Sequence, residues 1–172
     1  MKALVFVVVL LCVPLAWAAD SAKPLQAVSI VRADGVRLDF SVELAASEEQ
    51  RHHGLQGRRQ LAARHGMLFD FEQPILATMW MKDTPLALDM LFIDERGVVV
   101  WLRARTTPGS LALITTPHVA RYVLELNGGE VQSLGIAPGD RVVWREAAAR
   151  LSVAPPLAPQ TPRQSRPTTA AP

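Results

Sequence analysis

The sequence predicts a mainly β fold, a compact antiparallel β-sandwich or barrel with two or three short helices. Apolar and polar residues alternate along residues 36–44, as they do in a strand with one face in water. Further short apolar segments follow, separated by turn residues rather than by long helices, which favours antiparallel pairing. Residues 19–146 have a length that usually forms one domain.

The elements are predicted in order from local signals. A strand over residues 28–32 is joined to the alternating strand by an Asp-Gly turn at residues 34–35, which indicates a hairpin. Ser47 with Gln50 three positions later forms a capping-box pattern, so a short helix is expected to begin there and to end near Gly54. The remaining strands are expected at residues 67–71, 75–82, 89–94, 98–105, 122–127 and 141–145.

The amino end has the pattern of a secretory signal peptide. Lys2 precedes an apolar run over residues 3–13, and the small residues Ala16 and Ala18 predict cleavage before Ala19. The run is far shorter than the roughly 20 residues that a membrane-spanning helix needs. We therefore expect residues 1–18 to be removed, no transmembrane segment to remain after cleavage, and a periplasmic or secreted location.

The carboxyl end, residues 147–172, is predicted to be a disordered tail rich in Pro, Ala and Thr. It has no aromatic and no acidic residue, and it holds closely spaced prolines such as Pro155 and Pro156. Such a segment lacks the apolar area that would offset the entropy of ordering its backbone. Its expected role is that of a spacer or tether. The single cysteine, Cys12, lies in the signal peptide, so no disulfide is expected in the domain.

The charge of the domain argues against nucleic acid as a partner. The chain has a sequence pI of about 9.1. Of its 18 Lys and Arg residues, 4 lie outside residues 19–146, which leaves 14 against 16 Asp and Glu and a net charge near −2. A general phosphate-binding surface would need a net positive charge.

Two acidic residues on predicted strands are candidates for chemistry. Asp89 lies in a strand with apolar residues on both faces, and a carboxylate there needs compensation; Lys82 and the backbone amides of residues 84–86 are the expected partners. Glu125 lies on the face of its strand opposite Tyr122. If that face is solvated, Glu125 is an ordinary exposed carboxylate; if Glu125 converges with Asp89, the two could act as an acid and a base. For Asp89 itself the alternatives are a structural brace of the turn and a ligand-binding or catalytic role.

The segment 80–94, WMKDTPLALDMLFID, is the best candidate for a ligand site. Trp80 and Lys82 share a strand face with Thr78, and an aromatic ring beside polar side chains suits stacking against a sugar or another planar ligand. Asp83 and Thr84 follow in the turn. The alternative for Trp80 is a core position. Trp101 and two arginines share a face of the following strand, where stems packed over the ring are expected.

Other sources of chemistry are not evident in the sequence. The domain has no thiol and no serine in a strand-to-helix elbow, so covalent acyl transfer is not expected. Its four histidines lack the spacing of metal ligands, and its glycines match no phosphate-binding loop. We expect no cofactor and no metal.

Five blocks, in their order and spacing, carry a family resemblance: ELAASEEQRHHGLQGR, GMLFDF, WMKDTPLALDMLFID, YVLELNGG and GIAPGD. The chain resembles the domain of unknown function family 192 over residues 38–144. This resemblance implies a mainly β fold and often an extracytoplasmic location, but no substrate. Gln56 stands where methionine is more usual, and Asp83 where asparagine is common.

Two classes of function follow as hypotheses. The first is a periplasmic module that binds a small ligand or an envelope protein through residues 80–89. The second is a carboxylate-based hydrolase of an envelope glycan or small ester, with Asp89 and Glu125 as acid and base. A tethered scaffold protein is a further alternative.

Overall fold

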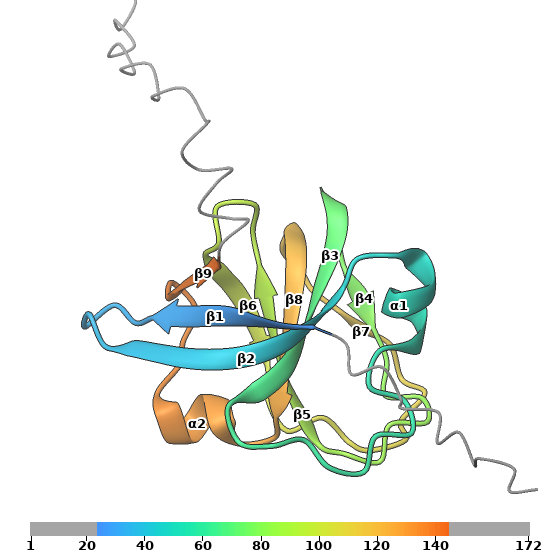
Figure 1. The fold of residues 1–172 in the computed structure, drawn as a ribbon. Helices are drawn as coiled ribbons and strands as arrows, with labels where there is room; N and C mark the ends of the chain where they lie inside the picture. Colours follow the sequence, from blue (N-terminus) through green and yellow to red (C-terminus); the bar gives the residue numbers. More distant parts are fainter. Residues whose placement is uncertain (1–23, 145–172) are drawn as a thin grey trace, which may run out of the picture.

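The computed structural model describes residues 24–144, and its core is a seven-stranded sheet with the order β6-β5-β8-β3-β2-β1-β9 (Figure 1). The predicted signal peptide and tail lie outside the described residues. The strands of this sheet are β1 (Leu25–Val31), β2 (Arg37–Ala45), β3 (His65–Ile75), β5 (Leu88–Ile93), β6 (Val99–Arg103), β8 (Ala120–Asn127) and β9 (Arg141–Trp144). A second, two-stranded sheet pairs β4 (Thr78–Met79) with β7 (Ile114–Thr115), and the helices are α1 (Glu48–His53) and α2 (Glu130–Leu134).

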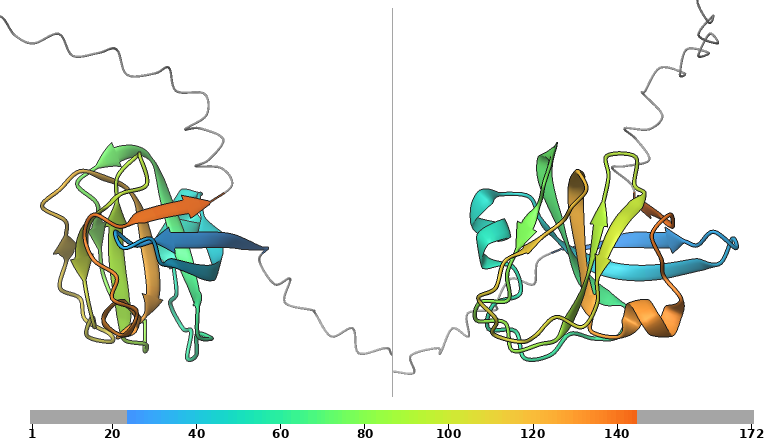
Figure 2. Two further views of the ribbon diagram at one scale, coloured as in Figure 1. Left: turned by 90° about the vertical axis from the view of Figure 1, so that its left-hand side faces the viewer. Right: turned by 180° about the vertical axis from the view of Figure 1, so that it is seen from behind.

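The large sheet curls into a half-barrel (Figure 2). Its two edges meet beside β6 and β9, where Val98 forms a bridge with Arg141 and the Val142 amide donates to the Gly97 carbonyl at 2.7 Å. This contact covers part of the backbone that a sheet edge leaves unpaired. The prediction of a mainly β fold is confirmed, and the part of the chain that the structure describes contains two short helices.

The expected antiparallel pairing is wrong at one position, because β2 and β3 are parallel, with Ser41 beside His65 and Ala45 beside Phe69. All other neighbours in the described sheet are antiparallel. Parallel neighbours cannot be joined by a tight turn and need a long crossover connection. Here the connection is residues 46–64, which contain α1 and place it against one face of the sheet (Figure 1).

Two apolar clusters lie on the two faces of the curled sheet. The inner cluster takes residues from all seven strands, including Phe40, Leu124 and Trp144, and is enclosed by the half-barrel. The outer cluster lies on the opposite face, where Met90 and Phe92 of β5 pack with residues of β4, β7 and the segment after α1. The candidate site lies on this outer face.

The predicted strand over residues 75–82 is wrong as a continuous strand. Ile75 ends β3, and only Thr78 and Met79 form β4. The alternation that suggested a strand is real, because Ala77, Met79 and Met81 are buried. However, the segment pairs with β7, which the sequence did not predict, over two residues only.

The other predicted strands, the hairpin and the capped helix are confirmed within a few residues of their expected bounds. Between residues 24 and 144 we find no helix with the length and apolar character that crossing a membrane requires.

Candidate ligand-binding site

Asp89 and Glu125 lie on adjacent antiparallel strands but face opposite sides of the sheet. Asp89 pairs with Leu126, whereas Glu125 pairs with Met90. Because cross-strand partners share a face and successive residues alternate, Asp89 points to the inner cluster and Glu125 to the outer one. The two side chains therefore lie on opposite faces of the sheet, and this arrangement does not bring Asp89 and Glu125 together as an acid and base pair.

Asp89 is a fully buried structural brace, with 0% of its surface exposed. Its Oδ1 accepts a hydrogen bond from the Arg105 amide at 2.7 Å, and its Oδ2 accepts from the Gly129 and Val131 amides at 2.9 and 2.8 Å. The expectation that this carboxylate needs a partner is confirmed. The named partners, Lys82 and the amides of residues 84–86, are wrong, because those groups lie before β5 and the carboxylate binds the segments that follow β6 and β8.

Glu125 is buried as well, with 3% of its surface exposed. Its cross-strand neighbours are Met67 on β3 and Met90 on β5, so the carboxyl group lies between two apolar side chains. Burial raises its pKa from the ordinary value of 4.5 to about 8, and no ion pair or hydrogen bond from the described residues contributes to this rise. Glu125 is therefore mostly a neutral carboxylic acid at pH 7.

Glu125 lines a cavity of about 20 Å³ on the outer face of the sheet. This cavity lies beneath α1 and the segment after it, and its other walls come from β3 and the residues around β4. The lining residues are Arg51, His52, His53, Gly54, Leu55, Gln56, Phe69, Met79, Trp80 and Thr84. Gln56, one of the departures from the family pattern, lines the same cavity, and its side-chain amide donates to the His52 carbonyl at 2.8 Å.

A larger depression of about 310 Å³, which we name the Trp80 groove, shares four lining residues with this cavity. The shared residues are Arg51, His52, Met79 and Trp80, and the other residues of the groove are Glu48, Thr78 and Leu113. Clefts that bind small molecules usually have volumes of about 300–1,000 Å³. The groove is therefore large enough for a small ligand, and Glu125 lines the smaller cavity that adjoins it.

An aromatic wall forms one side of the Trp80 groove. The His52 and Trp80 rings pack in a T-shaped arrangement, with a centroid distance of 5.4 Å and an interplanar angle of 74°. The Lys82 ammonium lies 5.6 Å from the centre of the same ring, a cation–π contact. Trp80 is only half-buried, so the alternative of a core tryptophan does not describe it fully.

The sequence candidates divide into three groups in space. Trp80, Lys82 and Thr84 gather around the groove and its cavity. The exposed Asp83 has a positive φ of 53°, and its carbonyl accepts from the Gly57 amide at 2.8 Å, so its main chain positions the segment after α1. Asp89 lies on the other face of the sheet.

Arg51 was missed by sequence reasoning, although it anchors the wall. Its guanidinium donates to the main-chain carbonyls of Ala46 and of Asp70, the latter at 2.8 Å, and pairs with Glu72 at 3.1 Å. Its side chain thereby joins the middle of α1 to β3 and to Ala46, the residue before the N-cap. His52 is next to it on the same helix, and no pattern in the sequence showed that α1 would lie beside Trp80.

The helix α1 begins with the capping box that the sequence predicts. The Gln50 amide donates to the Ser47 hydroxyl at 3.2 Å, and the Gln50 side-chain oxygen accepts from the Ser47 amide at 3.1 Å. We expect Ser47→Ala to lower the free energy of unfolding by about 1 kcal/mol, the usual cost of removing such a cap. Urea denaturation measures this loss; Ser133→Ala, at an exposed position in α2, is the matched control and should cost less.

No group of three His, Cys, Asp or Glu side chains within residues 24–144 is placed to hold a metal ion. The candidate site thus has three parts: the aromatic wall of Trp80 and His52, the buried neutral acid Glu125, and the groove of about 310 Å³.

These features define the class of the protein, a small half-barrel domain with a ligand-sized groove on the outer face of its sheet. The model of the domain of unknown function family 192, described as "Uncharacterized ACR", matches residues 29–144, and the chain belongs to this family.

Two solved structures are similar to this chain. One, from Sinorhizobium meliloti 1021, is described as a candidate transcription regulator; it is 44% identical, with a TM-score of 0.70, and the match covers 71% of this chain and 95% of that chain. The other, from Novosphingobium aromaticivorans DSM 12444, is described as a protein of unknown function; it is 32% identical, with a TM-score of 0.69 and coverage of 73% and 89%. No protein with a curated description matches the chain.

Proposed function

We propose that this chain is an exported domain that binds a small neutral ligand in the Trp80 groove. The observation that carries the proposal is the buried acid group of Glu125 in a cavity that shares Arg51, His52, Met79 and Trp80 with a groove of ligand size. Burying a carboxyl group without a partner costs free energy, and such a cost is typically accepted at functional sites. The periplasmic or secreted location rests on the signal-peptide pattern of residues 1–18.

The chemistry of the groove favours a sugar or a sugar-like molecule. Trp80 lines the groove and is only partly buried, and an indole ring can stack against a pyranose or another planar group. A neutral carboxylic acid can donate one hydrogen bond and also accept one, which suits the hydroxyl and amide groups of a neutral ligand. The small cavity that Glu125 lines has room for about one water molecule, and that water would relay the hydrogen bond to the ligand.

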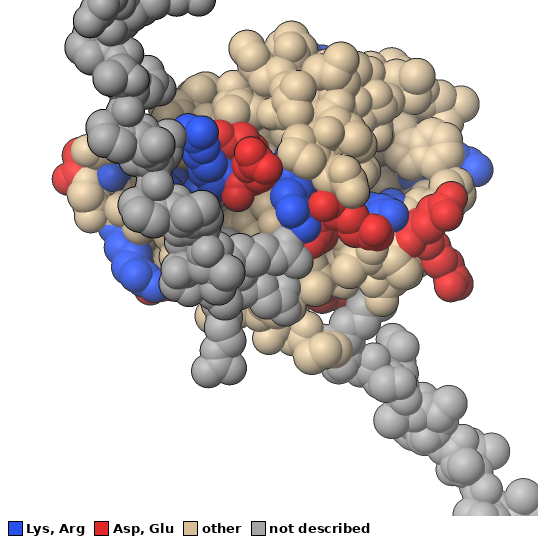
Figure 3. Space-filling model, turned by 90° about the horizontal axis from the view of Figure 1, so that it is seen from above, with Lys and Arg blue, Asp and Glu red and all other residues tan. Residues whose placement is uncertain are grey.

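Charge favours a small ligand over nucleic acid, in spite of the description of the Sinorhizobium meliloti relative. On the face drawn in Figure 3, basic and acidic side chains of the described residues alternate and form no continuous basic patch. A nucleic-acid surface needs clustered Lys and Arg to neutralise phosphates. An envelope protein that inserts a side chain into the groove is the second candidate partner.

The proposal can be tested by nuclear magnetic resonance of the ¹⁵N-labelled protein during titration with glucose and N-acetylglucosamine. We expect saturable shifts of the Trp80 indole N–H and of the Arg51 and His52 amides. Trp80→Ala should weaken binding at least tenfold, because it removes the stacking surface.

Trp101→Ala removes a tryptophan outside the groove and is the matched control, which should bind these sugars as the parent does. Equal binding by the parent and Trp80→Ala, or no response to either sugar, would contradict a neutral-sugar site in the groove.

A further inference from the structure

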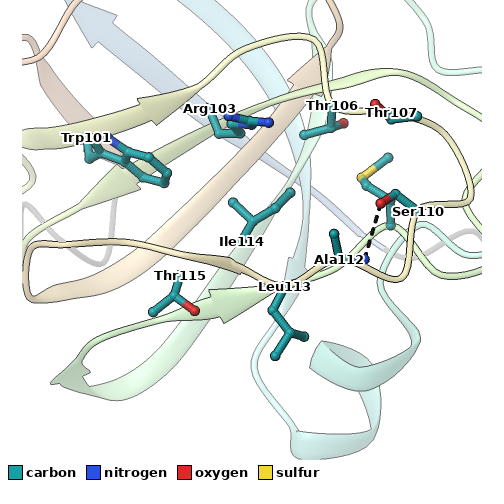
Figure 4. Close-up of a pocket in the computed structure, with 10 residues that line it drawn as sticks. Trp101, Arg103, Thr106, Thr107, Ser110, Ala112, Leu113, Ile114 and Thr115 are labelled. Atoms are coloured by element: carbon teal, nitrogen blue, oxygen red, sulfur yellow. Dashed lines mark hydrogen bonds between the residues drawn. The ribbon is translucent and has the colours of Figure 1, made fainter.

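A second hollow lies on the same outer face, between β6 and the segment that leads into β7 (Figure 4). Its volume is about 220 Å³. It contains none of the groove residues described above except Leu113, whose side chain lines both depressions. We name it the Arg103 hollow; its other lining residues are Met81, Trp101, Arg103, Thr106, Thr107, Ser110, Ala112, Ile114 and Thr115.

Arg103 gives this hollow a positive charge that the described residues do not neutralise. It is exposed, and it lies opposite Met90 in the sheet, so its side chain projects on the outer face. No ion pair or hydrogen bond joins its guanidinium to another residue between 24 and 144. A guanidinium of this kind can form two parallel hydrogen bonds with a carboxylate.

The Trp101 ring forms an apolar wall next to this charge. Trp101 lies opposite Phe92, and the two rings pack at a centroid distance of 5.0 Å and an angle of 51°. This contact fixes the tryptophan in place while leaving part of its surface exposed. Met81 and Ile114 extend the apolar lining.

The hydroxyl groups around the hollow are partly engaged in holding its rim. Thr106 donates to the Leu88 carbonyl and accepts from the Leu88 amide, each at 3.0 Å, and Thr115 pairs with Thr78 at 3.0 Å. The Ser110 hydroxyl accepts from the Ala112 amide, the bond drawn in Figure 4, and keeps its own hydrogen free to donate. The rim is therefore fixed, and it still offers a hydroxyl donor to a ligand.

We propose that the Arg103 hollow binds a small carboxylic acid with a planar apolar body. Arg103 holds the carboxylate, the apolar body lies against Trp101 and Ile114, and Ser110 donates a further hydrogen bond. A single guanidinium matches the single charge of a carboxylate, whereas a phosphate dianion would retain uncompensated charge. This site does not depend on the proposed function of the Trp80 groove.

The experiment compares phenylacetate with its neutral analogue phenylacetamide on the full-length ¹⁵N-labelled protein. Phenylacetate should shift the Arg103 Nε–H and Trp101 indole N–H signals saturably, and it should bind at least tenfold more tightly than phenylacetamide. Arg103→Gln should weaken phenylacetate binding at least tenfold and remove its advantage over phenylacetamide. Arg103→Lys should bind with intermediate affinity, because it keeps the charge without the planar fork.

A matched control tests whether phenylacetate binding depends on Arg103 itself and not on any exposed arginine. Arg96→Gln removes an exposed arginine from the turn between β5 and β6, outside the hollow, and should bind phenylacetate as the parent does. Unchanged binding in Arg103→Gln, or equal binding of phenylacetate and phenylacetamide, would overturn the proposal. Tighter binding of phenyl phosphate than of phenylacetate would overturn the choice of a carboxylate.

Discussion

Asp89→Ala should lower the free energy of unfolding by about 3–5 kcal/mol, the usual cost of removing one partner of a buried charged interaction. The substitution leaves the amides of Arg105, Gly129 and Val131 without their acceptor inside the half-barrel. Each buried donor that loses its partner costs about 1–3 kcal/mol. Because small domains are stable by only about 5–15 kcal/mol, much of the stability would be lost. Urea denaturation followed by circular dichroism measures the change.

Two further variants test the reason for this loss. Asp89→Asn keeps the shape but replaces one acceptor oxygen with an NH₂ group, which would face an amide donor, so it should also be clearly less stable than the parent. Asp39→Ala removes an exposed carboxylate on β2 and should leave stability nearly unchanged. If Asp89→Ala unfolds at the same urea concentration as Asp39→Ala, the three hydrogen bonds do not brace the fold.

Glu125 should make the stability of the protein fall as the pH rises from about 4.5 to above 8. Its pKa is higher in the folded state, at about 8, than its ordinary value of 4.5 in an unfolded chain. The stability that Glu125 contributes through this pKa difference is fully present below the unfolded-state pKa. It is lost as the pH rises through the folded-state pKa. The full difference corresponds to roughly 5 kcal/mol, so we expect an observable loss of about 3–5 kcal/mol. Glu125→Gln should remove this dependence, because its amide is neutral at every pH.

The measurement is the free energy of unfolding of the parent and of Glu125→Gln from pH 4.5 to pH 9. The advantage of Glu125→Gln over the parent should grow with pH and be largest above pH 8. Glu95→Gln, at an exposed turn position, controls for the loss of one negative charge. A constant difference between parent and Glu125→Gln over this range would mean that burial does not control the titration of Glu125.

Most of the fold could be predicted because its signals are local. The alternation along β2 and the capping box of α1 depend on residues that are close in sequence, and both are confirmed. The parallel pairing of β2 with β3 depends on which strands meet across the sheet, and no local pattern encodes that choice. The short pairing of β4 with β7 could not be predicted for the same reason, since it joins residues 78 and 115.

The candidate site could be predicted only in part. Trp80 and Lys82 were found because they are close in sequence and face the same way. The parity of Glu125 relative to Tyr122 was predicted, but its burial depends on α1 and β4, which come from distant parts of the chain. No sequence pattern predicted that His52 and Arg51 would line the groove, because this depends on where the connection between β2 and β3 places α1.

The connection between β2 and β3 forms part of the groove but none of the large sheet. Strand register and the enclosed core depend on the strands, whereas one wall of the groove belongs to residues 46–64, which join β2 to β3. The segment is attached through a few defined points, such as the buried Leu55 and the Asn127 side chain that donates to the carbonyls of Leu61 and Ala62. If those anchors are retained, this segment could be exchanged as a unit, which would reshape the Trp80 groove while the strands and the enclosed core stay as they are.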